Sequence, residues 1–101
     1  MPQLEKEIEQ KLVAIAKRHG GKCLKWVCPG WSGVPDRLLL LPGGRIIFVE
    51  LKRPKGGVLA KRQEWWRKEL WRLGFVSLVA WDLADINTLD LAIQDAVIRN
   101  K

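Results

Sequence analysis

The sequence predicts an α/β domain in which helices flank a mixed β-sheet, and three observations point to this class. Apolar residues make up 48% of the 101 residues, as in an ordinary globular protein. Their spacing switches along the chain between the helical period and the strand period. Glycine and proline clusters separate the resulting segments. A chain of this length is expected to build a single domain, residues 1–101, around one modest core.

Seven segments follow one another in the order α-β-β-β-α-β-α. The predicted helices span residues 4–18, 59–73 and 85–99, and the predicted strands span residues 22–28, 36–41, 45–52 and 75–81. Apolar residues at intervals of three and four indicate the helices, and glycines follow the first two. Pro42-Gly43-Gly44 joins the second and third strands as a hairpin. The last strand follows a helix and enters the sheet by a crossover, which makes the sheet mixed.

The charge of the chain favours a polyanionic partner. Eighteen Lys and Arg residues against eleven Asp and Glu residues give a net charge of +7, and residues 1–75 carry sixteen of the basic residues. Nucleic acid is the commonest partner of such a surface. No apolar run approaches the roughly 20 residues of a membrane span, and the charged N-terminus is unlike a signal peptide, so we expect a cytoplasmic protein. The candidate phosphate contacts are Lys17, Arg18, Lys22, Lys25, Arg37, Arg53, Lys55, Lys61 and Arg62.

Charged side chains stand at the end of the third predicted strand, on a face that begins as core. Strand alternation places Phe48, Glu50 and Lys52 on this face. A three-residue turn in the hairpin sets Asp36 directly opposite Glu50, with the two Cβ atoms roughly 5 Å apart. A two-residue turn would direct Asp36 to the other face. The pairing of the two strands therefore tests whether the carboxylates meet.

Two carboxylates so close repel each other unless a proton or a cation lies between them. Oxygen ligands of this kind suit Mg²⁺ or Mn²⁺. Lys52 could then orient or deprotonate an attacking water, or stabilise charge in the transition state. The alternative is an ion-pair cluster of Asp36, Glu50 and Lys52 with a purely structural role.

Polar residues on two predicted helices extend this constellation. Gln63 is the polar exception on the apolar stripe of the second helix. Its amide either holds Lys52, a water or the DNA backbone, or lies at the rim of the core. Glu5 and Glu9 form an i, i+4 pair beside the buried stripe of the first helix. Either could reach the sheet as a further metal ligand, or simply stabilise the start of the helix.

These residues belong to a set of spaced motifs. The set comprises Glu5-x-x-Ile8-Glu9, Gly20-Gly21, Lys25, Gly33-Val34-Pro35-Asp36-Arg37, Glu50-Leu51-Lys52 and Gln63. With this combination the chain resembles the VRR-NUC domain, a branch of the PD-(D/E)XK nuclease superfamily, from the first helix to about Trp81. The combination is far more specific than the PD…ExK triad alone.

The resemblance implies a restriction-endonuclease-like αβββαβ core, here followed by a C-terminal helix, and Mg²⁺- or Mn²⁺-dependent cleavage of DNA. By position, it implies metal binding by Asp36, Glu50, the Leu51 backbone carbonyl and a glutamate of the first helix, Glu5 or alternatively Glu9. It implies that Lys52 positions or activates the attacking water and that Gln63 is an accessory polar residue. Short stand-alone members are typical of phages and prophages. They resemble homodimers that cut four-way (Holliday) junctions in the bacterial host cell.

The tryptophans give a separate reason to expect a homodimer. Trp65 and Trp71 lie on the two flanks of the apolar stripe of the second helix. Exposed aromatic residues of this size often mark an interface, although they could equally pack under the last helix or cover the sheet edge. Two rival functions are a non-catalytic nucleic-acid-binding module and a phage accessory protein that meets its partner through these tryptophans.

Overall fold

The seven predicted elements occur in the predicted order in a computed structural model, which describes residues 5–52 and 58–99, the side chains of residues 5 and 96–99 apart. The elements are α1 (Glu5–Arg18), β1 (Lys22–Lys25), β2 (Arg37–Leu41), β3 (Arg45–Leu51), α2 (Lys61–Arg72), β4 (Val76–Ala80) and α3 (Leu83–Arg99). The α/β class and the C-terminal helix are thereby confirmed. None of the described helices is long and apolar enough to cross a membrane.

The four strands form one mixed sheet in the order β1-β2-β3-β4. The first three strands are antiparallel, and β4 lies parallel to β3 after the crossover through α2. In the hairpin, Leu41 faces Arg45 and Leu38 faces Phe48. This is the register of a three-residue turn, which confirms the pairing that sets Asp36 opposite Glu50.

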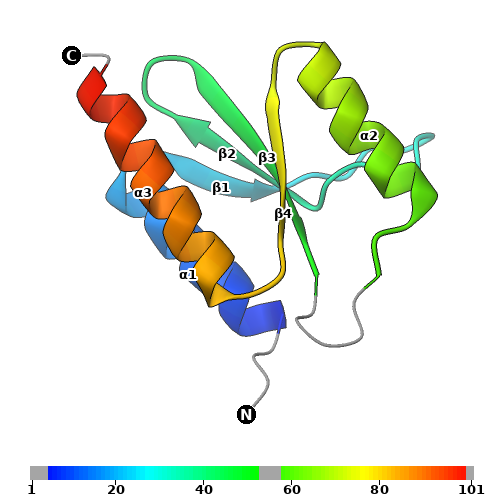
Figure 1. Ribbon diagram of the computed structural model, residues 1–101, viewed down its shortest axis with the longest axis horizontal. Helices are drawn as coiled ribbons and strands as arrows, with labels where there is room; N and C mark the ends of the chain where they lie inside the picture. Colours follow the sequence, from blue (N-terminus) through cyan, green and yellow to red (C-terminus); the bar gives the residue numbers. More distant parts are fainter. Residues whose placement is uncertain (1–4, 53–57, 100–101) are drawn as a thin grey trace.

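The helices cover the two faces of the sheet unequally (Figure 1). Helices α1 and α3 lie on one face, while α2 lies on the other. The main core lies between the sheet and the α1–α3 pair. Alternate residues of each strand point to this face, so the core residues of β2 and those of β3 are two positions apart. This core contains Ile8, Leu12, Ile15, Ala16, Leu39, Leu41, Val49, Leu51, Ala80, Ile86, Leu89 and Ile93.

Three elements begin or end a few residues away from their predicted bounds, each for a local reason. Strand β1 ends at Lys25 instead of Cys28, because the Cys28 carbonyl accepts the Trp31 amide at 3.2 Å in a turn that leaves the sheet. Helix α2 begins later than predicted, where the Gln63 side chain accepts the Ala60 amide at 2.9 Å. Helix α3 begins earlier, where the Asp82 carboxylate accepts the Asp85 amide at 2.9 Å.

Candidate active site

Asp36 and Glu50 meet where the β2–β3 ladder ends. Asp36 directly precedes β2, and the pairing of Arg37 with Val49 sets it opposite Glu50. The Asp36 Oδ2 atom accepts the Leu51 amide at 3.2 Å, while the Asp36 carbonyl accepts the Trp26 amide at 2.8 Å. Asp36 is therefore held by β3 and by the residue that directly follows β1.

Glu50 is a buried carboxylate whose two oxygens differ in their surroundings. Its side chain accepts the Gln63 amide nitrogen at 2.9 Å on Oε1, and the Lys52 Nζ atom lies 3.7 Å from the same oxygen. Its Oε2 atom is buried and has no hydrogen-bond partner among the described residues. A buried charged oxygen without a partner is costly in a folded protein. Such an atom suits a ligand that arrives after folding.

The pKa of Glu50 also shows that its negative charge is poorly stabilised. Burial raises the pKa of Glu50 to about 8, together with the negative charge of Asp36 and a hydrogen bond between the two carboxyl groups, against the lowering effect of the Lys52 ammonium. One lysine therefore does not neutralise the carboxylate pair. A divalent cation between the two carboxylates would remove the repulsion and favour the ionised form of both.

The donor set fits a hard cation. Asp36 and Glu50 offer carboxylate oxygens only, and Mg²⁺ commonly takes one or two carboxylates and keeps other positions for water and phosphate. Within residues 5–52 and 58–99 no cluster of three or more Asp, Glu, His or Cys side chains is assembled. Among the described residues the site thus brings together two carboxylates, those of Asp36 and Glu50.

The two α1 candidates are placed differently. The Glu9 carboxylate forms an ion pair with the Arg37 guanidinium at 2.6 Å. Arg37 pairs with Val49 rather than Glu50, so this ion pair lies on the α1 side of the sheet. The Glu5 side chain lies outside the described residues. The Leu51 carbonyl remains a predicted ligand, and the Leu51 contact that the structure shows is made by its amide.

Gln63 lies at the site, although with a partner that the sequence did not indicate. Its Nε2 donates to Glu50, and its Oε1 accepts the Ala60 amide at the start of α2. The side chain therefore links the helix start to the buried carboxylate and fixes the orientation of both. The signal was its position on the apolar stripe, which predicted that it faces the sheet.

The predicted phosphate contacts divide into two groups. Lys17, Arg18 and Lys22 lie at the hairpin end of the sheet, where Lys22 pairs with Leu40 and Arg18 forms an ion pair with Asp90. Leu40 faces Ile46, four residues before Glu50, so Lys22 is about 13 Å from the carboxylates along the strand. The exposed residues nearer the site are Lys25, Lys61 and Arg62. Arg53 and Lys55 lie outside the described residues.

Arg37 differs from the other predicted phosphate contacts because its side chain is covered. The side chain is only 12% exposed and already holds Glu9. Its guanidinium therefore serves first to join the start of β2 to α1. The spacing of basic residues along the sequence did not distinguish this position from the exposed ones.

Packing of the loop at residues 26–36 onto α2 was not expected from the sequence. Ser32 accepts two hydrogen bonds on its carbonyl, from the Trp66 indole at 3.1 Å and from the Arg62 Nε atom at 3.3 Å. Gly33 has a φ of +84°, and a Cβ atom there would lie 2.5 Å from the Arg62 side chain. The glycine thus permits a close approach that no other residue could make. This contact brings the loop that carries Asp36 against the helix that carries Gln63.

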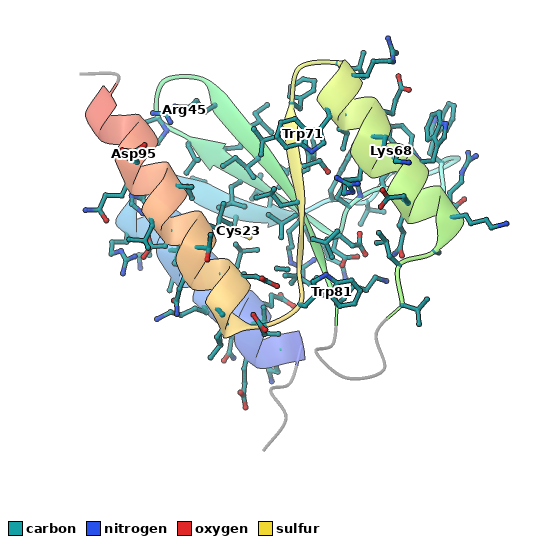
Figure 2. The ribbon with its side chains drawn as sticks, viewed as in Figure 1. Cys23, Arg45, Lys68, Trp71, Trp81 and Asp95 are labelled. Carbon is teal, nitrogen blue, oxygen red and sulfur yellow. The ribbon has the colours of Figure 1, made fainter. Side chains whose placement is uncertain are left out.

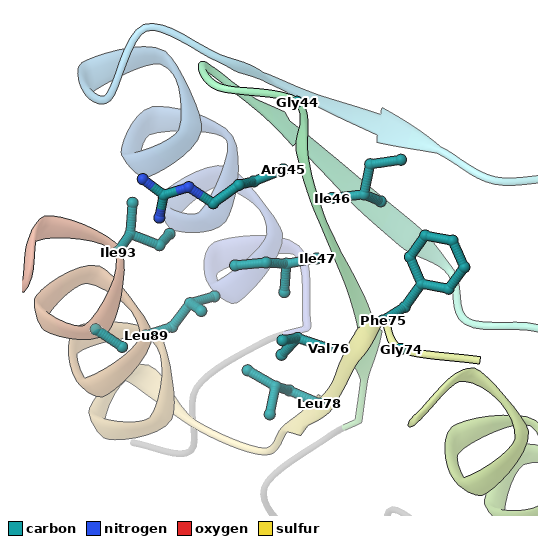
Figure 3. A pocket seen from close by; sticks show the side chains of 11 residues that line it. Gly44, Arg45, Ile46, Ile47, Gly74, Phe75, Val76, Leu78, Leu89 and Ile93 are labelled. Carbon is teal, nitrogen blue, oxygen red and sulfur yellow. The ribbon is translucent and has the colours of Figure 1, made fainter. Parts of the chain in front are cut away.

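The two carboxylates lie away from an apolar cavity next to α3. The cavity, of about 610 Å³, lies between α3 and the starts of β3 and β4. Its lining is apolar apart from Arg45, as Figure 3 shows. It offers no carboxylate pair, and Glu50 is at the other end of β3. The candidate site is therefore the polar end of the sheet.

Comparison with known proteins agrees with this architecture. No protein-family model matches the chain. A segment of 50 residues is 54% identical to “Putative nuclease p44” of Acyrthosiphon pisum secondary endosymbiont phage 1, covering 50% of this chain and 54% of that protein. The chain thus spans about half the length of the curated relative that it matches.

Solved structures extend the similarity to most of the chain. A VRR_NUC domain superposes with a TM-score of 0.78 at 26% identity, covering 84% of this chain and 91% of that one. A VRR_NUC domain protein superposes with a TM-score of 0.70 at 15% identity, covering 88% and 86%, and shows the fold alone. The resemblance to VRR-NUC domains that the motifs indicated is confirmed.

Proposed function

We propose that this chain is a divalent-metal-dependent endonuclease that hydrolyses DNA phosphodiester bonds. The observation that carries the proposal is the Glu50 carboxylate, 5% exposed, with one oxygen unpartnered, beside Asp36 and 3.7 Å from Lys52. The phage relative named as a putative nuclease and the VRR_NUC domain at 26% identity support the nuclease activity. A buried oxygen without a hydrogen-bond donor is unusual in an ion-pair cluster that serves only structure.

In the proposed mechanism each residue has a defined part. Asp36 and Glu50 would hold Mg²⁺ or Mn²⁺, assisted by the Leu51 carbonyl and by Glu5, since Glu9 is engaged by Arg37. When bound, the cation supplies positive charge that stabilises the phosphate in the transition state. Lys52 orients the attacking water and withdraws its proton or stabilises the developing charge. Gln63 keeps the Glu50 carboxylate in its orientation through the 2.9 Å hydrogen bond.

The substrate is proposed to be branched DNA, with the four-way junction as the preferred form, and the enzyme a homodimer. A two-fold axis would present two sites to a symmetric junction. The surface proposed for self-association is the apolar end of α2, where Trp71, Leu73 and Phe75 are exposed. Trp71 also lies against β4, where its indole donates to the Ser77 carbonyl at 2.8 Å (Figure 2). Exposed apolar patches of this kind are typical of interaction sites.

The decisive experiment is a cleavage assay with purified protein on linear duplex, flap and four-way junction, each with Mg²⁺, Mn²⁺ or chelator. We expect metal-dependent cleavage that is fastest on the junction. Asp36→Asn should lose metal-dependent turnover, while Asp90→Asn, a carboxylate of α3 beside α1, serves as the matched control. Unchanged rates of Asp36→Asn at limiting Mg²⁺ would contradict the metal site.

The two rival functions give other results in the same assay. A non-catalytic module binds DNA without cutting it, and chelator leaves its affinity unchanged. An accessory interaction protein binds none of the three DNAs at any salt concentration. Either result would replace the nuclease proposal.

A further inference from the structure

A pair of exposed tryptophans lies beside the candidate site, on the loop before β2 and on α2. Trp31 is 54% exposed and Trp65 is 47% exposed. The Arg62 guanidinium lies between them, 5.9 Å from the Trp31 ring centre and 5.6 Å from that of Trp65. We name Trp31, Arg62 and Trp65 the tryptophan platform. Its charged centre distinguishes it from a simple apolar patch.

The tryptophan platform is fixed from beneath. The Trp66 ring meets both exposed rings edge to face, at 5.6 Å from Trp31 and 5.1 Å from Trp65. The Trp66 indole and Arg62 both donate to the Ser32 carbonyl, which ties the loop to the helix. The exposed rings are therefore ordered before any ligand arrives, so that binding loses little side-chain entropy.

Basic residues surround the aromatic rings. A hollow of about 400 Å³ beside Trp65 is lined by Leu59, Lys61, Glu64 and Lys68. The one acidic residue of this hollow, Glu64, is paired with Arg67. Flat ring faces next to ammonium and guanidinium groups match the two parts of a nucleotide, its base and its phosphate.

We propose that the tryptophan platform binds unpaired nucleotides of the DNA strand next to the cleavage site. Paired bases in a duplex already have both faces stacked, so exposed rings can take only bases at a strand end, a flap or a branch point. The platform and the carboxylates share their supporting elements, because α2 also carries Gln63, which bonds to Glu50, and the loop with Trp31 leads to Asp36. The inference rests on the proposed function and deepens it, since binding of unpaired bases would make the enzyme prefer branched DNA to an uninterrupted duplex.

A protein partner fits this surface less well. The cores of protein interfaces are depleted in lysine, whereas Lys61 and Lys68 flank Trp65. The other exposed tryptophan of the helix, Trp71, is bordered by the exposed apolar residues Leu73 and Phe75. The two ends of α2 thus present different chemistry.

The test measures binding in chelator, where cleavage cannot interfere. Labelled oligodeoxythymidylate and a blunt duplex are titrated with wild-type protein and with Trp65→Leu, Trp31→Leu and Trp65→Phe. We expect each leucine variant to lose roughly tenfold in affinity for the single strand, with duplex affinity unchanged, because each removes one stacking ring. Trp65→Phe keeps a ring face and should retain most of the affinity. Melting curves check that the variants are folded. Trp31→Leu changes the loop and not α2, so it tests the tryptophan platform independently of Trp65→Leu.

Each outcome separates this inference from the nuclease proposal. Selective loss of single-strand binding supports the tryptophan platform even if no DNA is cleaved. Wild-type single-strand affinity in both leucine variants overturns it even if duplex and junction are cleaved. Dissociation of a dimer by Trp65→Leu, with single-strand affinity unchanged, would assign the rings to a protein interface and also overturns it. Equal losses on single strand and duplex would show a general DNA contact without selection for unpaired bases, and would overturn it as well.

Discussion

The two faces of the sheet use alternate residues of the same strands, yet they differ in what they bury. On the face under α1 and α3, Val49 and Leu39 are completely buried among aliphatic side chains. On the face under α2, the neighbouring residue Glu50 is buried as well, and so is Ser77 of β4, which pairs with Phe48. A single helix covers this second face, and its rim consists of half-buried and exposed aromatic rings.

This difference assigns stability and chemistry to opposite sides of one strand. The two-helix face buries apolar area, which is the main favourable contribution to folding, and among the described residues it has no buried side-chain nitrogen or oxygen without a partner. The α2 face contains the Glu50 carboxylate at a cost in stability, because Gln63 donates to only one of its oxygens and the Lys52 ammonium lies 3.7 Å from the same one. An alternating strand can therefore carry a strained polar site if its other face is well packed. Substitutions on the two faces should separate activity from stability.

The largest effect should come from Lys52→Ala. We expect DNA cleavage to fall by at least about 10²-fold, because the residue supplies general acid–base or charge stabilisation next to Glu50. DNA affinity should survive, since many other cations contact the backbone. Single-turnover cleavage and anisotropy on the same junction measure the two quantities. Lys11→Ala, an exposed lysine of α1, is the control, and full activity of Lys52→Ala would refute the role of this lysine.

On the opposite face the expected loss is in stability instead. Leu39→Ala should lower the free energy of unfolding by about 2–5 kcal/mol, because it leaves a cavity in the core. The adjacent residue Leu40 is 40% exposed and points to the other face. Leu40→Ala should cost less than about 1 kcal/mol. Urea unfolding compares the pair directly, and similar losses would show that the two faces are packed equally.

The order of elements and the hairpin register could be predicted because both depend on local signals. Apolar periodicity identifies the helices, and a three-residue turn fixes which residues of β2 and β3 are paired. The convergence of Asp36 and Glu50 follows from that register alone. This part of the site is encoded in a short stretch of sequence.

Contacts between segments distant in the sequence could not be predicted from these local signals. Nothing in the periodicity of α1 indicates that Glu9 bonds Arg37, and Gln63 was expected at the site without its bond to Glu50. The loop around Ser32 packs on α2 through the close approach at Gly33, which is a tertiary event. Such contacts depend on the angle between elements, and that angle is set by the whole core.

The buried carboxylate should make stability depend on pH in chelator. The pKa of Glu50 is raised from 4.5 to about 8 on folding, so the folded state favours its protonated form. Protonated Glu50 contributes its full share to the free energy of unfolding below about pH 4.5. This share, a few kcal/mol, is lost as the pH rises to about 8. Glu50→Gln should flatten this part of the profile and raise stability near pH 8. Mg²⁺ should oppose the loss in wild-type protein, and identical profiles for the two proteins would contradict the assignment.

The smallest effect is expected at the solvent edge of the apolar face, where α1 meets α3. Asp90 bonds the Arg18 guanidinium and, at 2.6 Å, the His19 Nε2 atom, and these hydrogen bonds hold the pKa of Asp90 below its usual value. A lowered pKa means that this contribution is present at neutral pH and is lost as pH falls through the folded-state pKa. Asp90→Asn should therefore cost about 0.5–1 kcal/mol, and less at high salt, because the pair is close to solvent. Thermal melting at two salt concentrations measures the loss. Cleavage by Asp90→Asn should be unaffected, since α3 packs on the face of the sheet opposite Glu50. A drop in cleavage equal to that of Lys52→Ala would show that the two faces are coupled.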